Sequence, residues 1–311
     1  MKILILGAGA TGGYFGGRLA DLGLDVHFLV RPRRQAQLAE DGLRVESPLG
    51  DIHRAVATIN RDQLDDSFDL VILACKAWDL GAAIEAVAPA MRGQARVLPL
   101  LNGLSHLETL DAAFGRAAVL GGLCQIAATL TPEGTIRHLN RFSTLIFGPR
   151  DDSQPALCEA FVAACRGVRF DLRPSPDIVQ EMWEKWVLIA TLAGATCLMR
   201  AAIGAIVAQP DGSAIIAAML AESRAIAASA GHEPRPNVLT RFRELLTEAG
   251  SPLAASMLRD VEAGNAVEVD HILGDLLSRA EAAGVKAPLL QAARCQLGIY
   301  EAQRRLSAGS R

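Results

Sequence analysis

Apolar residues follow two different patterns along the chain. In the first half, short apolar runs alternate with amphipathic stretches, which predicts parallel strands separated by helices. The expected strands are residues 2–6, 26–30, 69–75 and 95–101, and the expected helices are 13–22, 80–91 and 108–114. Residues 119–147 contain strand-like runs broken near Pro132, which predicts two or three strands. One more helix and a short strand at 168–172 complete this α/β part.

In the second half, apolar residues recur at intervals of three and four, which is typical of helices. The expected helices are 178–199, 213–230, 239–249 and 270–283, and Gly231, Gly250, Gly264 and Gly284 lie near their ends. Glycine there supplies the left-handed residue that closes a helix. Two prolines in 173–177 mark a linker. The sequence therefore predicts an N-terminal Rossmann-type α/β domain, residues 1–172, followed by an all-α domain, residues 173–311.

The first strand runs directly into a G-x-G-x-x-G pattern that opens a helix. Gly7 can make the tight turn, Gly9 lets the backbone approach a pyrophosphate, and Gly12 lets the helix pack close to the strand. The phosphates then lie on the unpaired N–H groups of the helix N-terminus. The predicted cofactor-binding residues of this turn are Gly7, Ala8, Gly9, Ala10, Thr11 and Gly12.

Arg31 follows the second strand, where an NAD-binding protein usually carries an acidic residue. A carboxylate there repels a 2′-phosphate, whereas a guanidinium binds it in a bidentate manner. This favours NADP over NAD or FAD. The alternative is a solvated basic loop formed by Arg31, Arg33 and Arg34.

Composition narrows the class of protein. A chain of 311 residues with 50% hydrophobic content can bury the cores of about two domains, and a net charge of −3 gives no basic field for nucleic acid. No signal pattern and no apolar run of membrane-spanning length is present, so a cytoplasmic protein is expected. The histidines and cysteines show no metal-ligand spacing, and the six cysteines are expected to be reduced and buried.

Lys185 and Glu268 are candidates for chemistry in the second half. Lys185 lies between Trp183 and Trp186 on an apolar helix, and partial desolvation there makes an amine a proton donor. The alternative is an i,i+4 pair with Glu181 on a solvated face. Glu268 precedes an expected helix and either accepts a hydrogen bond from a substrate hydroxyl or only stabilises the helix dipole.

Asn102 and Lys76 each come directly after an expected parallel strand. Ligands of open α/β sheets bind beyond the carboxyl ends of such strands, so both side chains are candidates for the cofactor site. The alternative is that they are ordinary polar residues of surface loops.

Taken together, these motifs resemble the ketopantoate reductase family over nearly the whole chain. The resemblance rests on the glycine turn with Arg31, Lys76 with Trp78, Asn102 with Gly103, Trp183 with Lys185, and the stretch from Ser256 through Asp260 and Glu268 to Asp270. It implies a Rossmann domain joined to a helical domain, with NADPH as hydride donor. The implied reaction reduces a 2-oxo acid, ketopantoate, to the 2-hydroxy acid pantoate in pantothenate synthesis.

The resemblance also implies roles for single residues. The glycine turn holds the pyrophosphate, Arg31 holds the 2′-phosphate, and Lys76 and Asn102 lie at the nicotinamide end. Lys185 is the implied proton donor, Ser256 and Asn102 contact the substrate, and Glu268 orients the polar groups at the cofactor and substrate. The implied partner is a small oxo acid, with no nucleic acid and no membrane, and a homodimer is one option.

The chain departs from the family pattern at three pocket positions. Ile189, Ala193 and Ile203 stand where the family presents asparagines. An unpaired buried hydroxyl costs about 1–3 kcal/mol, so the substrate is expected to be less hydroxylated than ketopantoate. Two alternatives stay open: an NADP-dependent reductase of a more apolar 2-oxo acid, and an NADPH-binding sensor without catalysis.

Overall fold

In a computed structural model of the protein, which describes residues 1–309, the chain forms two compact units. The first, here called the α/β unit, comprises Met1–Leu101 and His106–Val179. The second, the helical unit, comprises Asn102–Ser105 and the chain from Gln180 onward. The α/β unit thus continues past the boundary expected at residues 172 and 173. The short segment Asn102–Ser105 groups with the helical unit although it directly follows a strand and loop of the α/β unit.

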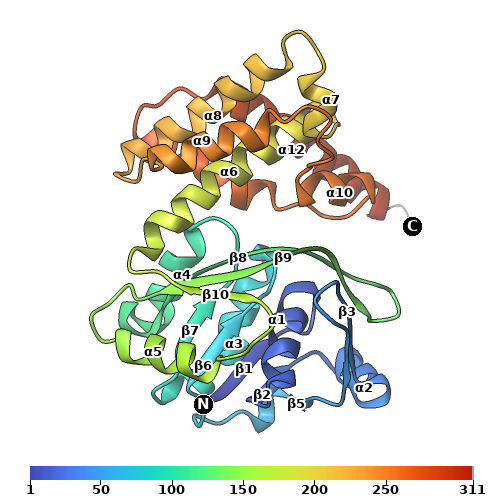
Figure 1. Ribbon diagram of the computed structural model, residues 1–311, viewed down its shortest axis with the longest axis vertical. Helices are drawn as coiled ribbons and strands as arrows, with labels where there is room; N and C mark the ends of the chain where they lie inside the picture. The colour runs from blue at the N-terminus through green and yellow to red at the C-terminus, as the bar shows by residue number, and fades with distance from the viewer. Residues whose placement is uncertain (310–311) are drawn as a thin grey trace. The chain divides into compact units, whose positions relative to one another are not determined.

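A five-stranded parallel sheet forms the base of the α/β unit (Figure 1). Its strands, in spatial order, are β5 (Ala57–Ile59), β2 (Asp25–Leu29), β1 (Lys2–Leu6), β6 (Leu70–Leu73) and β7 (Arg96–Pro99). All four neighbouring pairs are parallel. Every residue of β6 is buried, which explains why this strand is a continuous apolar run rather than an alternating one. The predicted α/β fold class is confirmed.

The helices of this unit begin close to the predicted positions, with one addition. They are α1 (Ala10–Asp21), α2 (Pro32–Asp41), α3 (Leu80–Val87), α4 (Ser105–Phe114) and α5 (Pro155–Ala164), with short 3₁₀ turns η1 (Arg61–Gln63), η2 (Ala77–Asp79), η3 (Ala90–Arg92) and η4 (Arg116–Ala118). Helix α2 replaces the basic loop that was the alternative interpretation of the arginine run. Pro32 explains its start, because proline fits the first turn of a helix, where no N–H partner is needed.

A second sheet lies on the other side of α1. It contains β10 (Asp171–Pro174), β9 (Ile136–Gly148), β3 (Leu43–Glu46) and β4 (Ile52–Arg54) in that order, with β8 (Gly121–Leu130) paired antiparallel to β9. Helix α1 packs against strands of both sheets. Small residues are needed there, because a Cβ at Gly13 would lie 2.3 Å from Ile136 and one at Gly17 would lie 2.7 Å from Leu43. Since β10 includes Arg173 and Pro174, the expected linker begins inside a strand.

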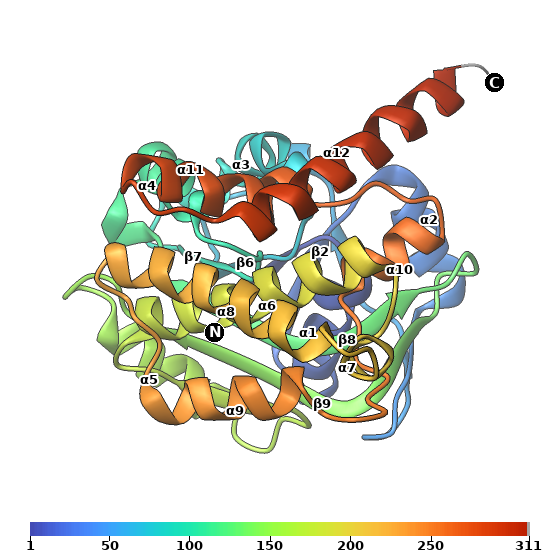
Figure 2. The ribbon, with the colours of Figure 1, turned by 90° about the horizontal axis from the view of Figure 1, so that it is seen from above.

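The helical unit contains all the helices predicted for the second half. Its elements are α6 (Ile178–Met199, whose first two residues belong to the α/β unit), α7 (Ile203–Val207), α8 (Gly212–Ser229), α9 (Pro236–Leu246), α10 (Ser256–Glu262), the π-helical turn η5 (Asp270–Gly274), α11 (Asp275–Ala282) and α12 (Pro288–Gly309). Helices α7, α10 and α12 were not predicted. Helix α12 packs on α8, which Figure 2 also labels, and on η5. The four glycines expected at helix ends all have positive φ, between 69° and 80°. No helix among residues 1–309 has the length and apolar character needed to cross a membrane.

Only some of the cysteines are buried. Cys158, Cys165 and Cys197 are buried, and burial raises the pKa of their thiols to about 11, 12 and 12 respectively, so they stay protonated at neutral pH. Cys295 on α12 is exposed, so the expectation that all six are buried is wrong. Ala293 and Leu297, two positions before and after it, are fully buried, whereas Cys295 stands next to the exposed Arg294 on α12.

Candidate functional site

The glycine turn has the geometry predicted for it. Gly7 has φ +91°, in the left-handed region that favours glycine, and its N–H donates to the carbonyl of Leu29 at 2.9 Å. A Cβ on Gly12 would lie 2.3 Å from the Gly7 carbonyl oxygen, so the close approach of helix and strand is confirmed. A Cβ on Gly9 would meet no atom within 4 Å. The space over Gly9 is therefore open in the protein, as approach of a pyrophosphate requires.

The first turn of α1 follows Gly9 without a side-chain cap. Gly9 is the N-cap, its carbonyl accepts from the N–H of Gly13, and Ala10 and Thr11 begin the helix. Ala8 is buried under the turn. The N–H groups at a helix start have no intrahelical partner and attract anions, so this turn has what a phosphate site needs.

Arg31 is the N-cap residue of α2 and carries an exposed guanidinium. Its side chain is 82% exposed, and Nη2 donates to Asp79 Oδ1 at 3.0 Å. An ion pair as exposed as this one contributes about 0–1 kcal/mol. A dianionic phosphate can therefore replace Asp79 as the partner of Arg31 at little cost.

Arg34 contacts the glycine turn directly, which the sequence did not reveal. Its Nε donates to the Ala8 carbonyl at 3.2 Å, and its Nη1 donates to Gln37 and to the Gly134 carbonyl. Burial lowers the pKa of this guanidinium. The helical spacing from Arg31 to Arg34 could have indicated this position, but only if α2 had been recognised as a helix.

Lys76 lies at the start of η2, directly beyond the sheet strand β6. It is exposed, and its Nζ lies 5.6 Å from the centre of the Trp78 ring, itself 53% exposed. This places a cation and an aromatic ring together at the carboxyl end of a central parallel strand, where ligands of such sheets bind. The proposed contact of Lys76 with the cofactor stays a prediction.

Lys185 and Asn102 are joined in the helical unit, although 83 residues separate them in the chain. Lys185 Nζ donates to Asn102 Oδ1 at 3.0 Å, and both side chains are half-buried. The bond connects the middle of α6 with the segment that enters α4. Two residues predicted from separate sequence signals, one as proton donor and one as a contact of substrate and cofactor, therefore lie within hydrogen-bond distance.

Arg279 lies over the two tryptophans that flank Lys185 in the sequence. Trp183 and Trp186 are buried with ring centres 5.0 Å apart, and the Arg279 guanidinium lies 5.7 Å and 5.5 Å from the two rings. The expectation that the two rings flank the Lys185 amine rested on sequence adjacency. On a helix, neighbouring residues point in different directions, so adjacency did not determine which cation packs on the rings.

Glu268 and Ser256 also belong to the helical unit. Glu268 is half-buried just before η5, and its carbonyl accepts from the N–H of Ile272 at 3.0 Å. Ser256 is exposed at the start of α10, next to Ala255, whose N–H donates to Thr196 Oγ1. Thr196 lies about 16 Å along α6 from Lys185, at 1.5 Å per residue. The roles of both residues toward substrate and cofactor stay predictions.

The three positions that depart from the family pattern are buried or half-buried. Ile189 is half-buried one helical turn after Lys185, and Ala193 is buried one turn further. Ile203 is fully buried, and its N–H donates to the carbonyl of Leu253 at 2.9 Å. The face of α6 that continues from Lys185 is therefore apolar.

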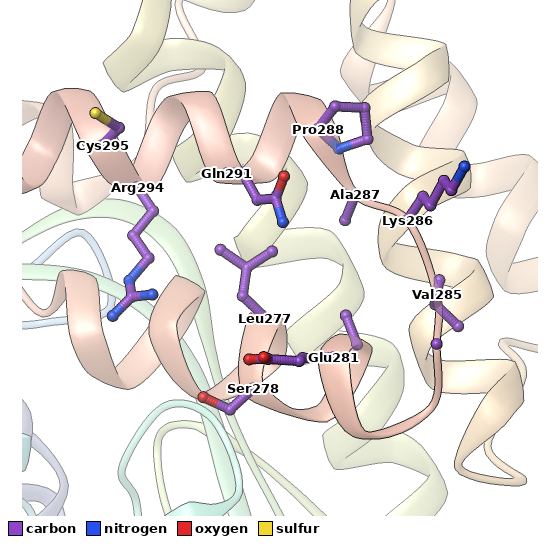
Figure 3. A pocket seen from close by; sticks show the side chains of 12 residues that line it. Leu277, Ser278, Glu281, Val285, Lys286, Ala287, Pro288, Gln291, Arg294 and Cys295 are labelled. Atoms are coloured by element: carbon purple, nitrogen blue, oxygen red, sulfur yellow. The ribbon is translucent and has the colours of Figure 1, made fainter.

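A separate groove of about 720 Å³ lies between α11, α12 and the loop that joins them (Figure 3). Its lining combines Glu281 with Lys286 and Arg294, and it contains neither Lys185 nor Asn102. Arg294 also lies 3.7 Å from Asp270 in an ion pair. Because the charges in this groove are mixed and partly compensated, the groove does not compete with the Lys185 region as the candidate active site.

Comparison with known proteins gives one consistent result. Residues 3–152 match the sequence model described as Ketopantoate reductase PanE/ApbA, and residues 177–297 match the model described as Ketopantoate reductase PanE/ApbA C terminal. The chain is 35% identical over 304 residues to the uncharacterized oxidoreductase YkpB of Bacillus subtilis, covering 98% of this chain and 100% of that protein. It is 26% identical to the 2-dehydropantoate 2-reductase of a Nostoc species, covering 98% and 96%.

Solved structures agree in fold. The PanE/ApbA family ketopantoate reductase of Ralstonia eutropha superposes with a TM-score of 0.85 at 26% identity, covering 98% of this chain and 100% of that one. D-mandelate dehydrogenase in complex with NADH and anilino(oxo)acetate superposes with a TM-score of 0.87 at 20% identity, covering 98% and 100%. At that identity the second similarity supports the fold alone.

Proposed function

Because this chain belongs to the ketopantoate reductase family, we propose that it uses NADPH to reduce a 2-oxo acid to the corresponding 2-hydroxy acid. The family consists of dinucleotide-dependent oxidoreductases that act on CH–OH groups. The observation that supports the proposal most strongly is the hydrogen bond from Lys185 Nζ to Asn102 Oδ1 at 3.0 Å. It holds an amine at a fixed place and direction, which a proton donor requires.

The residues of the α/β unit fit a phosphorylated dinucleotide. The open space over Gly9 accommodates a pyrophosphate, the first turn of α1 offers its N–H groups, and the exposed Arg31 guanidinium offers a partner for a 2′-phosphate. The reduced nicotinamide of NADPH supplies the hydride that reduction of a carbonyl carbon needs. The proposal requires that the nicotinamide reaches the substrate beside Lys185.

Lys185 acts on the oxygen of the reacting carbonyl. As the carbon gains a hydride, negative charge grows on this oxygen, and an ammonium at hydrogen-bond distance stabilises it and then transfers a proton. Asn102 Oδ1 accepts a hydrogen bond from one of the three N–H groups of the ammonium and so fixes the direction of the amine. General acid catalysis of this kind contributes about 10²–10⁴ in rate.

The substrate class is tested with a matched pair of 2-oxo acids. The family relationship makes ketopantoate, and so a step in pantothenate synthesis, the first candidate, whereas the apolar Ile189, Ala193 and Ile203 favour a 2-oxo acid without a side-chain hydroxyl. Ketopantoate and 2-oxoisovalerate differ by one hydroxymethyl group. We expect kcat/KM with NADPH to be higher for 2-oxoisovalerate than for ketopantoate. A large advantage of ketopantoate over 2-oxoisovalerate would remove the apolar alternative and leave the pantothenate role.

Arg31→Ala is expected to raise the Kd of NADPH about 10–100-fold while changing the Kd of NADH less than about threefold. The reason is that hydrogen bonds to a charged group contribute about 1.5–3 kcal/mol, and only NADPH carries the 2′-phosphate. Fluorescence titration of both cofactors measures the effect. Arg33→Ala, which removes an exposed arginine of the same run, is the control and should leave both Kd values unchanged. Equal weakening of NADPH and NADH by Arg31→Ala would contradict the role given to this side chain.

A further inference from the structure

His271 contacts the segment that carries Asn102. Ser105 Oγ and His271 Nδ1 share a hydrogen bond at 3.1 Å. Gly103 lies against the same residue: a Cβ there would be 3.2 Å from the His271 carbonyl oxygen and 3.5 Å from its Nε2. With φ +73°, Gly103 also adopts a backbone conformation that favours glycine. The segment Asn102–Ser105 is thus held closely against one histidine.

A second hydrogen bond connects the histidine's turn to the helix of Lys185. Trp186 Nε1 donates to the carbonyl of Ile272 at 2.9 Å, and the bond is buried. Trp186 follows Lys185 on α6, and Ile272 follows His271 in η5. Three hydrogen bonds therefore form a closed circuit: Lys185 to Asn102, Ser105 to His271, and Ile272 to Trp186.

The π-helical turn η5 explains how this circuit closes. A π turn contains one more residue than an α turn, which redirects side chains and carbonyls, and such turns are frequent at functional sites. In η5 the ring of His271 contacts the Asn102 segment while the next carbonyl, that of Ile272, contacts α6. The same turn begins two residues after Glu268, whose carbonyl accepts from Ile272 N–H.

From this circuit we infer that His271 is a positioning residue for the reductase reaction. Its Nδ1, acting through Ser105, holds the Asn102 segment so that Asn102 Oδ1 stays bonded to Lys185 and the amine keeps its direction toward the carbonyl oxygen of the substrate. His271 does not itself contact the reacting atoms in this scheme. The inference rests on the proposed function for its kinetic consequence, and on the three hydrogen bonds for its structural content.

Kinetics of three variants test the kinetic part. His271→Phe keeps the ring and removes its nitrogens, Ser105→Ala removes the partner, and His271→Asn keeps a polar atom near the place of Nδ1. We expect the first two to lower kcat about tenfold each, as loss of one hydrogen bond worth about 1.4 kcal/mol predicts, with the Kd of NADPH unchanged. The double variant His271→Phe/Ser105→Ala should be no slower than either single variant, because both substitutions break the same hydrogen bond. His271→Asn should retain about a third of wild-type kcat or more.

A second measurement does not depend on turnover. The chain has only four lysines, at positions 2, 76, 185 and 286, so peptide mass spectrometry can follow the acetylation rate of each one. Asn102→Ala should raise the rate at Lys185 relative to Lys286, and His271→Phe and Ser105→Ala should raise it in the same direction. Melting temperatures show which variants remain folded. If His271→Phe is unfolded, the comparison of Ser105→Ala with His271→Asn still tests the hydrogen bond.

The outcomes separate the two proposals. If the wild-type protein reduces no 2-oxo acid, the proposed function fails, and the labelling of Lys185 alone then decides the role of His271. Unchanged labelling in His271→Phe, with increased labelling in Asn102→Ala, overturns the positioning role. So do additive losses of kcat in the double variant, or a His271→Asn variant as slow as His271→Phe.

Discussion

Replacement of Lys185 by alanine is expected to lower kcat for the best 2-oxo acid about 10²–10⁴-fold, the range typical of removing a general acid. The Kd of NADPH should stay within about twofold of wild type, because the residues proposed to bind the phosphates lie in the α/β unit. Single-turnover measurements of NADPH oxidation test this directly, since they report the hydride step without product release. A loss of this size corresponds to about 3–5 kcal/mol of transition-state stabilisation.

Two controls make the Lys185 result specific. Lys286→Ala removes a lysine in the loop before α12 and should leave kcat unchanged, and Lys185→Met keeps the length and apolar stem of the side chain while removing the amine. Lys185→Met should be as slow as Lys185→Ala. Near-wild-type turnover in either Lys185 variant would remove this amine from the mechanism, and a wild-type protein that binds NADPH without reducing any oxo acid would favour the sensing alternative.

The second large effect is expected in the glycine turn. Gly12→Ala should lower the stability of the protein, whereas Gly9→Ala should weaken the binding of NADPH. At Gly12 the added Cβ would lie 2.3 Å from the Gly7 carbonyl oxygen and 3.1 Å from Ala74, so helix α1 must shift. Overpacking of this kind costs about 1–3 kcal/mol, and the free energy of unfolding should fall by that amount. At Gly9 the Cβ meets no protein atom within 4 Å, so stability should be unchanged.

Cofactor binding separates the same two variants. Gly9→Ala places a methyl group where the pyrophosphate is proposed to approach, so the Kd of NADPH should rise about tenfold or more in a protein of normal stability. Urea unfolding and fluorescence titration of NADPH, carried out on both variants, provide the comparison. Normal NADPH binding by Gly9→Ala would show that no ligand approaches the backbone at this point.

Several parts of the fold could be predicted from local sequence because short-range physics decides them. The positive φ of Gly7 follows from a tight turn directly after a strand, and α6 matches the predicted span 178–199 because its apolar period is long and uninterrupted. Shorter elements were missed. Helix α2 is polar and buries only Leu38, and strand β5 has only three residues, so neither contains an apolar run from which it could be recognised.

In the candidate site, too, single residues could be predicted from the sequence but their contacts could not. Lys185 and Asn102 could each be selected from the sequence, one from its helix and one from its position after a strand. That they bond to each other, that Arg279 lies over the two tryptophans, and that Arg34 contacts Ala8 could not be predicted. These contacts join residues that lie 26 to 96 positions apart in the chain. A local sequence pattern does not indicate which distant side chain contacts a given residue.

The sequence by itself determined the alternation of strands and helices in the first half, the helical character of the second half, the glycine turn with its dinucleotide chemistry, and the residue types available for catalysis. Periodicity, glycine conformation and side-chain chemistry are properties of neighbouring residues, so they can be read along the chain. The tertiary structure alone decided the closed circuit of Lys185, Asn102, Ser105, His271, Ile272 and Trp186. That circuit depends on packing among three distant segments and on one π-helical turn, and no pattern among neighbouring residues specifies which distant segments pack together.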